Sequence, residues 1–318
     1  MDILLTGSVA YDYLMTFPGL FKEQILPERL ESISLSFLVE SMSRQRGGVA
    51  PNIAYSMALL GTRPRVMATV GEDFEEYRAW LEAKGVDTSL MEVVPDVYTA
   101  SFFATTDQAS AQIASFYPGA MGHASSQSLK DLPSKPELVL VSPNEPGAMT
   151  KFAAEARELG IPYLYDPSQQ VLRLDGKELA RDMEGAQFLF CNDYEFGLIS
   201  KKTGWNLDQI LERVNILVIT RGKDGADLYA GDDTVHIPTV PEDEIVDPTG
   251  VGDAFRGGFL AGYSCGFDWK LCGEIGSLAA VYCLEQNGPQ SHAYSREEFV
   301  ARFRKNFDDE GKLDSLIE

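Results

Sequence analysis

Segments that suit strands alternate with segments that suit helices along most of this sequence, and no other feature restricts the fold so strongly. Short apolar runs at Leu138–Val141 and Ile216–Thr220 predict buried strands. Stretches at 148–159 and 251–264 predict helices, and Gly160 ends the first of them. Because strands that alternate with helices form a mostly parallel sheet covered on both faces, we expect a fold of the α/β class.

Two segments, at about 9–46 and 97–118, depart from this alternation. Within the first, residues 32–39 alternate polar and apolar side chains, with the period of a half-exposed strand. Within the second, 98–105 and 112–117 predict a further strand pair. We expect these segments to form a small antiparallel sheet apart from the main body.

The charge of the chain excludes some partners. It carries 27 Lys and Arg against 48 Asp and Glu, a formal net charge of −21 over 318 residues. Nucleic acids and anionic membranes are bound by clustered Lys and Arg, so we expect neither partner. A phosphorylated small ligand stays open, because backbone N–H groups at a helix start can bind one. The acid-rich residues 308–318 predict a frayed, solvated end.

Targeting and redox features favour a cytoplasmic protein. No apolar stretch approaches the ~20 residues of a membrane span, and residues 1–7 contain an acid and no basic leader. The four cysteines lack CxxC spacing, which predicts reduced, buried thiols. The three histidines form no ligand pair, so we expect no zinc site.

The densest chemical signal is the string DPTGVGDAFRGG at 247–258. It matches neither a P-loop nor a dinucleotide-binding fingerprint. Gly250 and Gly252 allow a sharp turn, and the helix that begins at about Val251 presents unpaired N–H groups there, which makes an anion hole. Asp253 at its edge can take a proton from an attacking hydroxyl. The alternative is that Asp253 only stabilises the helix N-terminus.

Two other strings combine glycine or acid with a helix start. The string GGVAPNIA at 47–54 places Asn52 in the first helical turn behind paired glycines, although an ordinary loop and cap would look alike. The string NDYE at 192–195 follows a predicted strand, at the edge where open α/β sheets bind ligands. Its simpler interpretation is a capping box of Asn192 and Glu195.

Together these strings resemble the ribokinase/PfkB family of carbohydrate and nucleoside kinases, which carries a DTxGAGD-type motif and a GGxxxNxA motif. Pro248 and Val251 depart from the first motif but leave its glycines and Asp253 in place. The resemblance covers nearly the whole chain. It implies a single ribokinase-like domain over 1–318, with a central mostly parallel sheet flanked by helices. The small sheet, from about 9–46 and 97–118, would be its lid.

The resemblance also implies roles for particular residues. Asp253 would be the catalytic base, beside an anion hole of Gly250, Val251 and Gly252. The substrate would be held by residues near the start of the chain and in the lid: Asp12, Gly47, Gly48, Asn52 and Phe116. ATP would be bound by residues that follow later strands or lie near the chain end: Asn192, Thr220, Arg221, Gly222 and Asn287. Mg²⁺ would be held through water by Asn192 and Glu195.

Plainer roles stay open for some of these residues. Asp12 can be an ordinary turn residue, and Arg221 an exposed residue at a strand end. The assignment of Asn287 rests only on its position near the chain end, where family members wall the adenine pocket.

The substrate prediction favours a nucleoside, phosphorylated on its 5′-hydroxyl. The segment from Asp12 to Gly47 is long, and the predicted lid is rich in rings that can stack on a base: Phe17, Phe37, Phe102, Phe103, Phe116 and Tyr117. The motif strings look most like those of prokaryotic adenosine and broad-specificity nucleoside kinases. The rings can instead form a lid core or a homodimer contact.

Three other functions remain. A sugar kinase of the same family, acting on ribose, fructose or a sugar phosphate, is the first alternative. A non-catalytic nucleoside- or sugar-binding regulator is the second. A dinucleotide-dependent oxidoreductase is the third, although the glycine fingerprint is absent.

Overall fold

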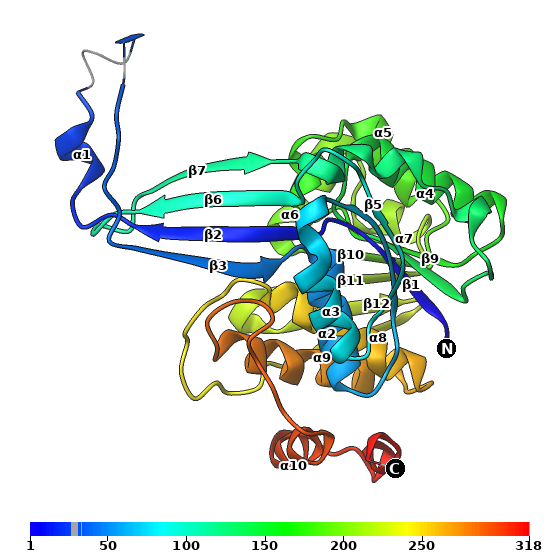
Figure 1. The fold of residues 1–318 in the computed structure, drawn as a ribbon. Coiled ribbons are helices and arrows are strands. Elements are labelled where there is room, and N and C mark those ends of the chain that lie inside the picture. The colour runs from blue at the N-terminus through cyan, green and yellow to red at the C-terminus, as the bar shows by residue number, and fades with distance from the viewer. Residues whose placement is uncertain (27–30, 33, 318) are drawn as a thin grey trace.

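Two β-sheets organise the protein (Figure 1). The structure is a computed structural model and describes residues 1–26, 31–32 and 34–317. Within these residues the larger sheet has nine strands in the order β13-β12-β11-β10-β9-β8-β1-β4-β5. Neighbours from β11 to β5 run parallel, and β12 and β13 add an antiparallel edge. The predicted α/β class, with a mostly parallel central sheet, is confirmed.

The strands of the larger sheet are β1 (Ile3–Thr6), β4 (Arg65–Val70), β5 (Asp87–Val93), β8 (Leu138–Val141), β9 (Tyr163–Tyr165), β10 (Phe188–Asn192), β11 (Ile216–Thr220), β12 (Ala226–Ala230) and β13 (Asp233–Ile237). The main helices are α2 (Val49–Leu59), α3 (Glu75–Ala83), α4 (Pro146–Glu158), α5 (Gly176–Met183), α6 (Asp193–Thr203), α7 (Leu207–Leu211), α8 (Val251–Ser264), α9 (Trp269–Leu284) and α10 (Arg296–Asn306).

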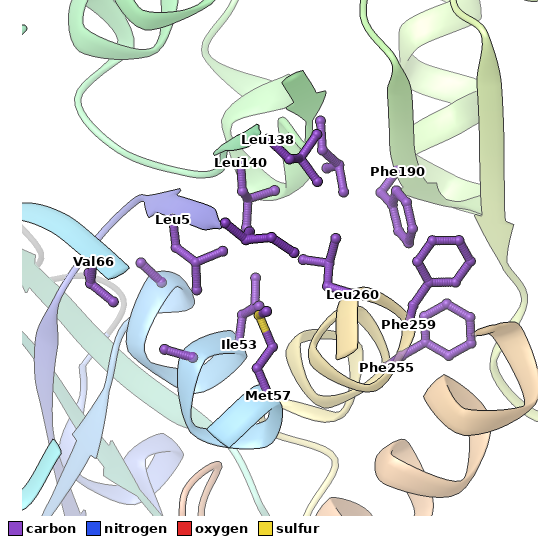
Figure 2. Packing of buried hydrophobic residues seen from close by; sticks show 14 of the residues in the cluster. Leu5, Ile53, Met57, Val66, Leu138, Leu140, Phe190, Phe255, Phe259 and Leu260 are labelled. Carbon is purple, nitrogen blue, oxygen red and sulfur yellow. The ribbon is translucent and has the colours of Figure 1, made fainter. Parts of the chain in front are cut away.

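Helices bury both faces of this sheet, which explains why its central strands are continuous apolar runs. On one face, Ile53 of α2 lies toward Leu5 and Leu140, and Phe259 of α8 packs on Phe190 with ring centroids 5.1 Å apart (Figure 2). On the other face, apolar residues of α4 to α7 form a second core with the alternate strand residues. The first core holds α2 and α8 side by side, and the starts of both helices build the candidate site.

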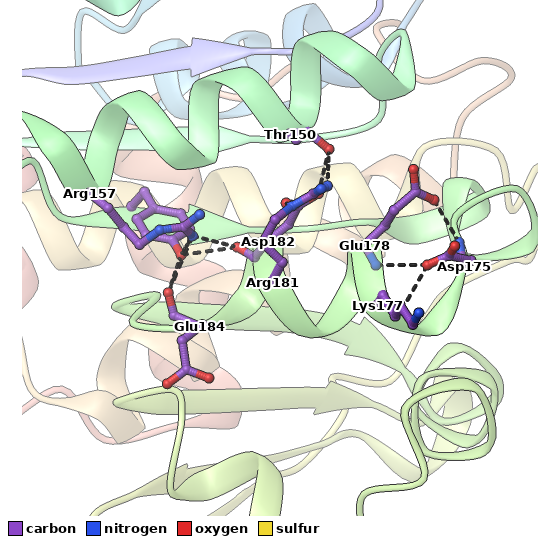
Figure 3. Close-up of polar contacts among 9 residues, drawn as sticks. Thr150, Arg157, Asp175, Lys177, Glu178, Arg181, Asp182 and Glu184 are labelled. Atoms are coloured by element: carbon purple, nitrogen blue, oxygen red, sulfur yellow. Dashed lines mark hydrogen bonds and ion pairs between the residues drawn. The ribbon is translucent and has the colours of Figure 1, made fainter.

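Arginine contacts add to the packing of α5 against α4. Arg181 donates from Nη2 to Thr150 Oγ1 at 2.7 Å and pairs with the buried Asp182 (Figure 3). Asp175 and Glu178 form a reciprocal capping box at the start of α5. This box lies outside the candidate site described below and provides a matched reference for it.

The smaller sheet contains β2 (Ala10–Thr16), β3 (Ser41–Gly47), β6 (Ala100–Thr106) and β7 (Gln112–Tyr117), in the order β3-β2-β6-β7. It projects from the main body and carries the short helix α1 (Phe21–Gln24) at its far end (Figure 1). Its strands fall inside the segments predicted for the lid. The sheet is mixed rather than purely antiparallel, because β2 and β6 run parallel.

The strand predicted at 32–39 is wrong for the part that the structure describes. Residues 34–39 form no strand, and Ser41–Gly47 pairs with β2 instead. The alternation placed Leu35 and Phe37 on one face of a strand, but Leu35 is exposed and the Phe37 ring packs on Phe17 and Phe21 at centroid distances of 5.1 and 5.0 Å. Residues 27–30 and 33, which belong to the predicted lid, lie outside the described residues.

The prediction of a frayed end at 308–318 is also wrong for its described residues. Leu313 and Leu316 are buried against α10 and its neighbours, and Asp309 accepts two hydrogen bonds of 2.9 Å from Arg304. The acid-rich composition of this segment therefore did not indicate that it packs against the rest of the protein. No helix in the described part of the chain has the length and apolar character that crossing a membrane requires.

Candidate active site

Two cavities flank the start of α8, at the edge of the large sheet where its parallel strands end. The smaller, of about 220 Å³, is lined by Asn52 and by residues of the small sheet. The larger, of about 780 Å³, is lined by Val251 and Gly252 of α8 and by residues that follow β10 and β11. Asp253 lies at the junction, because Asn52 Nδ2 donates to its Oδ2 at 2.8 Å.

Asp253 is suited to exchange a proton near neutral pH. Its surroundings raise the pKa of the carboxyl from 3.8 to about 7, chiefly because burial disfavours the charged form. The Arg256 charge and the Asn52 hydrogen bond act in the opposite direction, while Asp166 and Glu195 raise the pKa further. A carboxyl poised in this range can act as a general base.

Asn52 is itself held by a buried network. Gln290 Nε2 donates to Asn52 Oδ1 at 2.7 Å and to Tyr77 Oη at 2.5 Å. Tyr77 Oη donates in turn to the carbonyl of Gly47 at 3.0 Å. The network thus runs from the last residue of β3 to Asp253. We did not predict Tyr77 or Gln290 as site residues. The string Gly288-Pro289-Gln290 resembles that of nucleoside kinases but assigned no role to Gln290, and an isolated Tyr in a helix carries no sequence signal.

A buried ion pair supports the first turn of α8. Arg256 Nη2 donates to Asp166 Oδ1 at 3.0 Å, and its Nε pairs with Asp166 Oδ2. Arg256 Nη1 donates to the carbonyl of Gly252 at 2.9 Å. The only sequence signals for this pair were an acid directly after β9 and a basic residue in a helix that is mostly apolar.

The smaller cavity combines a carboxylate with aromatic rings. Asp12 of β2 lines it opposite Gly48 and Asn52, and Phe102 and Phe116 come from the paired strands β6 and β7. Burial, and then the nearby Asp247, raise the pKa of Asp12 from 3.8 to about 6. The other predicted lid rings lie elsewhere: Phe17 and Phe37 at the far end of the sheet, and Phe103 stacked on Tyr13 at 4.8 Å.

Two glycines allow the chain to turn at the site. Gly48 has a φ of 97°, and a Cβ there would lie 2.5 Å from the carbonyl oxygen of Ser8. Gly250 has a φ of 79°, and a Cβ there would lie 2.3 Å from Pro289 Cβ. Both conformations exclude other residues, so these turns place the starts of α2 and α8 against the cavities. Gly47 leaves room for Asp12, whose Oδ2 would lie 2.6 Å from a Cβ at position 47.

The larger cavity has a polar end and an apolar end. Asn192, Thr220, Gly222 and Lys223 line its polar end, next to the N–H groups of the first turn of α8. Its apolar wall consists of residues from β12, β13, α9 and the loop before α8: Ala226, Ile237, Val240, Ile245, Ala280, Val281 and Leu284. Such a cavity can take a molecule that has an anionic part and a flat apolar part.

Six predicted residues do not line either cavity. Gly47, Gly250 and Asp253 are next in sequence to lining residues, whereas Arg221, Asn287 and Glu195 make other contacts. Arg221 is exposed and pairs with Asp227 of β12 at 2.6 Å. Asn287 is exposed and accepts a 3.1 Å hydrogen bond from Gln45. Glu195 completes a capping box, accepting at Oε2 from the Asn192 backbone N–H at 2.8 Å while Asn192 Oδ1 accepts from the Glu195 N–H at 2.7 Å.

No cluster of three or more His, Cys, Asp or Glu side chains able to hold a metal ion occurs among the residues that the structure describes. Asn192 and Glu195 offer oxygens beside the polar end of the larger cavity. This donor set suits a Mg²⁺ ion that keeps most of its water and arrives on phosphate groups, because Mg²⁺ is commonly bound that way.

Comparison with known proteins agrees with this geometry. A model of the pfkB family of carbohydrate kinases matches residues 6–295. The nucleoside kinase of Methanothermobacter thermautotrophicus is 31% identical over 306 residues, which is 95% of each protein. The nucleoside kinase of Burkholderia thailandensis in complex with inosine is 40% identical, with a TM-score of 0.85 over 96% of this chain and 98% of that one. The same kinase in complex with ADP-inosine is 41% identical, with a TM-score of 0.84 over 96% of both chains.

Proposed function

This chain belongs to the pfkB family of carbohydrate kinases and is a phosphotransferase, and we propose that it transfers the γ-phosphoryl group of ATP to the 5′-hydroxyl of a purine nucleoside. The position of Asp253 carries this proposal. Its carboxyl lies at the junction of a cavity that suits a nucleoside and a cavity that suits a nucleotide. A base at that junction can reach an acceptor hydroxyl next to the phosphoryl group.

Asp253 removes the proton from the 5′-hydroxyl. The hydroxyl oxygen forms a bond to the γ-phosphorus while the bond from that phosphorus to the bridging oxygen of ADP breaks. The N–H groups of Gly250, Val251 and Gly252 donate to the transferring phosphoryl group. The nucleoside monophosphate and ADP then leave, and Asp253 gives its proton to solvent.

ATP binding in this proposal uses the larger cavity. Asn192, Thr220, Gly222 and Lys223 contact the phosphates, and the apolar wall receives adenine. Arg221 and Asn287 are left out, because their side chains are engaged with Asp227 and Gln45.

We propose that Mg²⁺ accompanies ATP and is contacted through water by Asn192 and Glu195. When bound, it neutralises part of the phosphate charge. Lys223 and the N–H groups of α8 do the same at the polar end of an otherwise acidic protein, whose net charge is −21.

The nucleoside occupies the smaller cavity in this proposal. Asp12 accepts from two ribose hydroxyls, Gly47 and Gly48 let the ribose approach the backbone, and Phe102 and Phe116 stack on the base. The two rings favour a nucleoside over a free sugar, which offers no flat surface to them. A sugar kinase of the same family remains the second candidate.

Assembly and location are further parts of the proposal. β7 is exposed along its whole length and forms an edge of the small sheet, so a second copy of the chain can pair there. We propose a homodimer through this sheet. Cys191, Cys272 and Cys283 are buried and unpaired in the described part of the chain, which supports work in the reducing cytoplasm.

An assay of acceptor-dependent ATP consumption tests the function. Adenosine, inosine, guanosine and cytidine are compared with ribose, fructose and fructose phosphates. We expect purine nucleosides to give the highest kcat/KM. If ribose or fructose exceeds every nucleoside, the substrate assignment is overturned. If nucleosides bind but no acceptor stimulates ATP consumption, the protein is a binding regulator, and if NAD(P) binds in place of ATP it is an oxidoreductase.

A further inference from the structure

The hydrogen bonds between Gly47 and Asp253 have only one consistent direction. The Gly47 carbonyl can only accept, so Tyr77 donates to it and must accept from Gln290. Gln290 therefore presents its NH₂ group to both neighbours, and Asn52 Oδ1 accepts from it. Asn52 is left with its own NH₂ group toward Asp253.

Burial makes this direction strict. Tyr77 is fully buried, and Asn52 and Gln290 are 6% and 8% exposed, so water cannot replace a lost partner easily. Rotating the Gln290 amide would place its oxygen against Asn52 Oδ1, acceptor against acceptor. Rotating the Asn52 amide as well would turn its oxygen toward Asp253, which only a protonated carboxyl could satisfy.

We infer that Gln290 and Tyr77 are positioning residues, which act through Asn52 to keep the Asp253 carboxylate ionised and oriented as the base. Neither side chain lines a cavity and both are buried, whereas Asp253 is partly exposed next to Gly252 of the larger cavity. The same network limits what Asn52 offers a nucleoside. Its oxygen already accepts from Gln290 and one amide hydrogen already goes to Asp253, so the second hydrogen of the NH₂ group and the second lone pair of the oxygen remain for a ribose hydroxyl.

Other titratable groups face Asp253 and stay unchanged when the network is altered. They are Arg256 on its own helix, Asp166 after β9, Glu195 on α6 and the Cys283 thiol on α9. Variants at positions 77 and 290 touch none of them, so a change in Asp253 titration reports the network alone. The inference rests on the proposed function only where activity is the measurement.

The decisive experiment is a ¹³C NMR titration of the whole protein labelled at aspartate carboxyl carbons, with the Asp253 signal assigned from Asp253→Asn. Gln290→Met keeps the side-chain length but removes the donor, and Tyr77→Phe removes the hydroxyl. Without the network, the ionised Asp253 carboxylate loses its hydrogen bond from Asn52. The pH midpoint of the Asp253 titration should therefore rise by about one pH unit in Gln290→Met. The apparent pKa of the acid limb of the kcat/KM profile should rise by the same amount, and activity should recover at high pH. Tyr77→Phe should give a smaller rise in both.

Matched controls separate positioning from simple destabilisation. Gln127→Met removes a donor to the Leu90 carbonyl, and Tyr163→Phe removes a buried hydroxyl that donates to backbone carbonyls. Both should lower Tm without moving the Asp253 midpoint. An unmoved midpoint in Gln290→Met and Tyr77→Phe would overturn the inference, as would an equal shift in the controls. If Gln290→Met does not fold, Tyr77→Phe decides alone. A wild-type protein that phosphorylates no acceptor would refute the proposed function, while the titration would still decide the inference.

Discussion

Asn52 and Asp253 are 201 positions apart in the chain, yet the amide nitrogen of Asn52 donates to Oδ2 of Asp253 at 2.8 Å. The contact joins the first turn of α2 to the first turn of α8. Because each helix start also lines a cavity, this one bond links the acceptor side of the site to the phosphoryl side.

Replacing the base should remove turnover while substrate still binds. In Asp253→Asn the size of the side chain is kept and the proton acceptor is lost, so kcat should fall by about 10²- to 10⁴-fold. The dissociation constant for adenosine, measured by calorimetry, should stay within a few-fold of wild type. Glu297→Gln, an exposed change in the first turn of α10, should leave both quantities unchanged. Near-normal turnover in Asp253→Asn would contradict the role of base.

The pH profile of kcat/KM should show an acid limb, since this ratio reports the free enzyme. As pH falls below about 7, Asp253 becomes protonated and the base is lost. Asp12, with a pKa of about 6, should steepen the decline at lower pH. A flat profile between pH 5 and 8, measured where the protein stays folded, would contradict both assignments.

The same raised pKa has a consequence for stability, with a defined sign. Between pH 3.8 and about 7 the folded state binds more protons at Asp253 than the unfolded state does. This carboxyl alone therefore lowers the free energy of unfolding as pH rises through that window. Asp253→Asn should remove this loss of stability at high pH. The difference in Tm between Asp253→Asn and wild type should therefore be more favourable to the variant at pH 8 than at pH 4.

Breaking the buried pair of Arg256 and Asp166 should cost far more stability than breaking an exposed one. Arg256→Met leaves Asp166 charged and buried, which costs about 3–5 kcal/mol. Lys130→Met breaks the exposed pair with Glu158 and should cost no more than about 1 kcal/mol. Urea denaturation measures both, and the double variant Arg256→Met/Asp166→Leu should recover much of the loss. Equal costs for the two single variants would contradict this account.

The aromatic rings of the small sheet should contribute to binding of the nucleobase and not to binding of the ribose. Phe116→Ala removes a stacking surface from the smaller cavity, so KM for adenosine should rise about 10-fold. Phe103→Ala is the matched control, because that ring lies on the adjacent strand and stacks on Tyr13 outside the cavity. Any activity on ribose should change equally in the two variants. If both variants raise KM for adenosine equally, the loss of affinity comes from a disturbed sheet and not from lost stacking on the nucleobase.

Glu195 should affect the dependence on Mg²⁺ beyond its role as a helix cap. Glu195→Gln keeps an acceptor for the Asn192 N–H but removes the charge, so the Mg²⁺ concentration that gives half-maximal rate should rise several-fold. Glu178→Gln makes the same change in the capping box of α5, outside the site, and should lower only the stability of that helix. Chelation of Mg²⁺ should abolish activity in all three proteins. An identical Mg²⁺ requirement in wild type and Glu195→Gln would leave Glu195 as a cap only.

The sequence predicted the parts of the site that depend on local backbone. Residues 247–258 predicted the turn at Gly250 and the start of α8. The paired glycines Gly47 and Gly48 predicted the turn before α2. The partners of Asn52 could not be predicted, because Tyr77 and Gln290 reach it only after α3 and the segment behind α9 have packed.

Prediction failed where a neighbour in space decides the outcome. Arg221 looked free to bind phosphate because β12, which carries its partner Asp227, was not predicted. Residues 34–39 look like a strand, but the ring that creates this period packs at the end of the small sheet. In both cases a side chain was assigned a partner from its local pattern, and the tertiary structure supplied another.

The rings that line the nucleoside cavity come from one short hairpin, β6 and β7, whereas the base and its supports come from elements scattered across the chain. The stacking surface of this cavity therefore depends on one contiguous stretch of sequence, while Asp12, Gly48 and Asn52 line the rest of it. Natural variation or laboratory exchange of residues 100–117 can redirect base preference and leave the phosphoryl-transfer apparatus untouched. This separation offers a physical route by which a single ancestral enzyme could diversify its acceptors without passing through inactive intermediates.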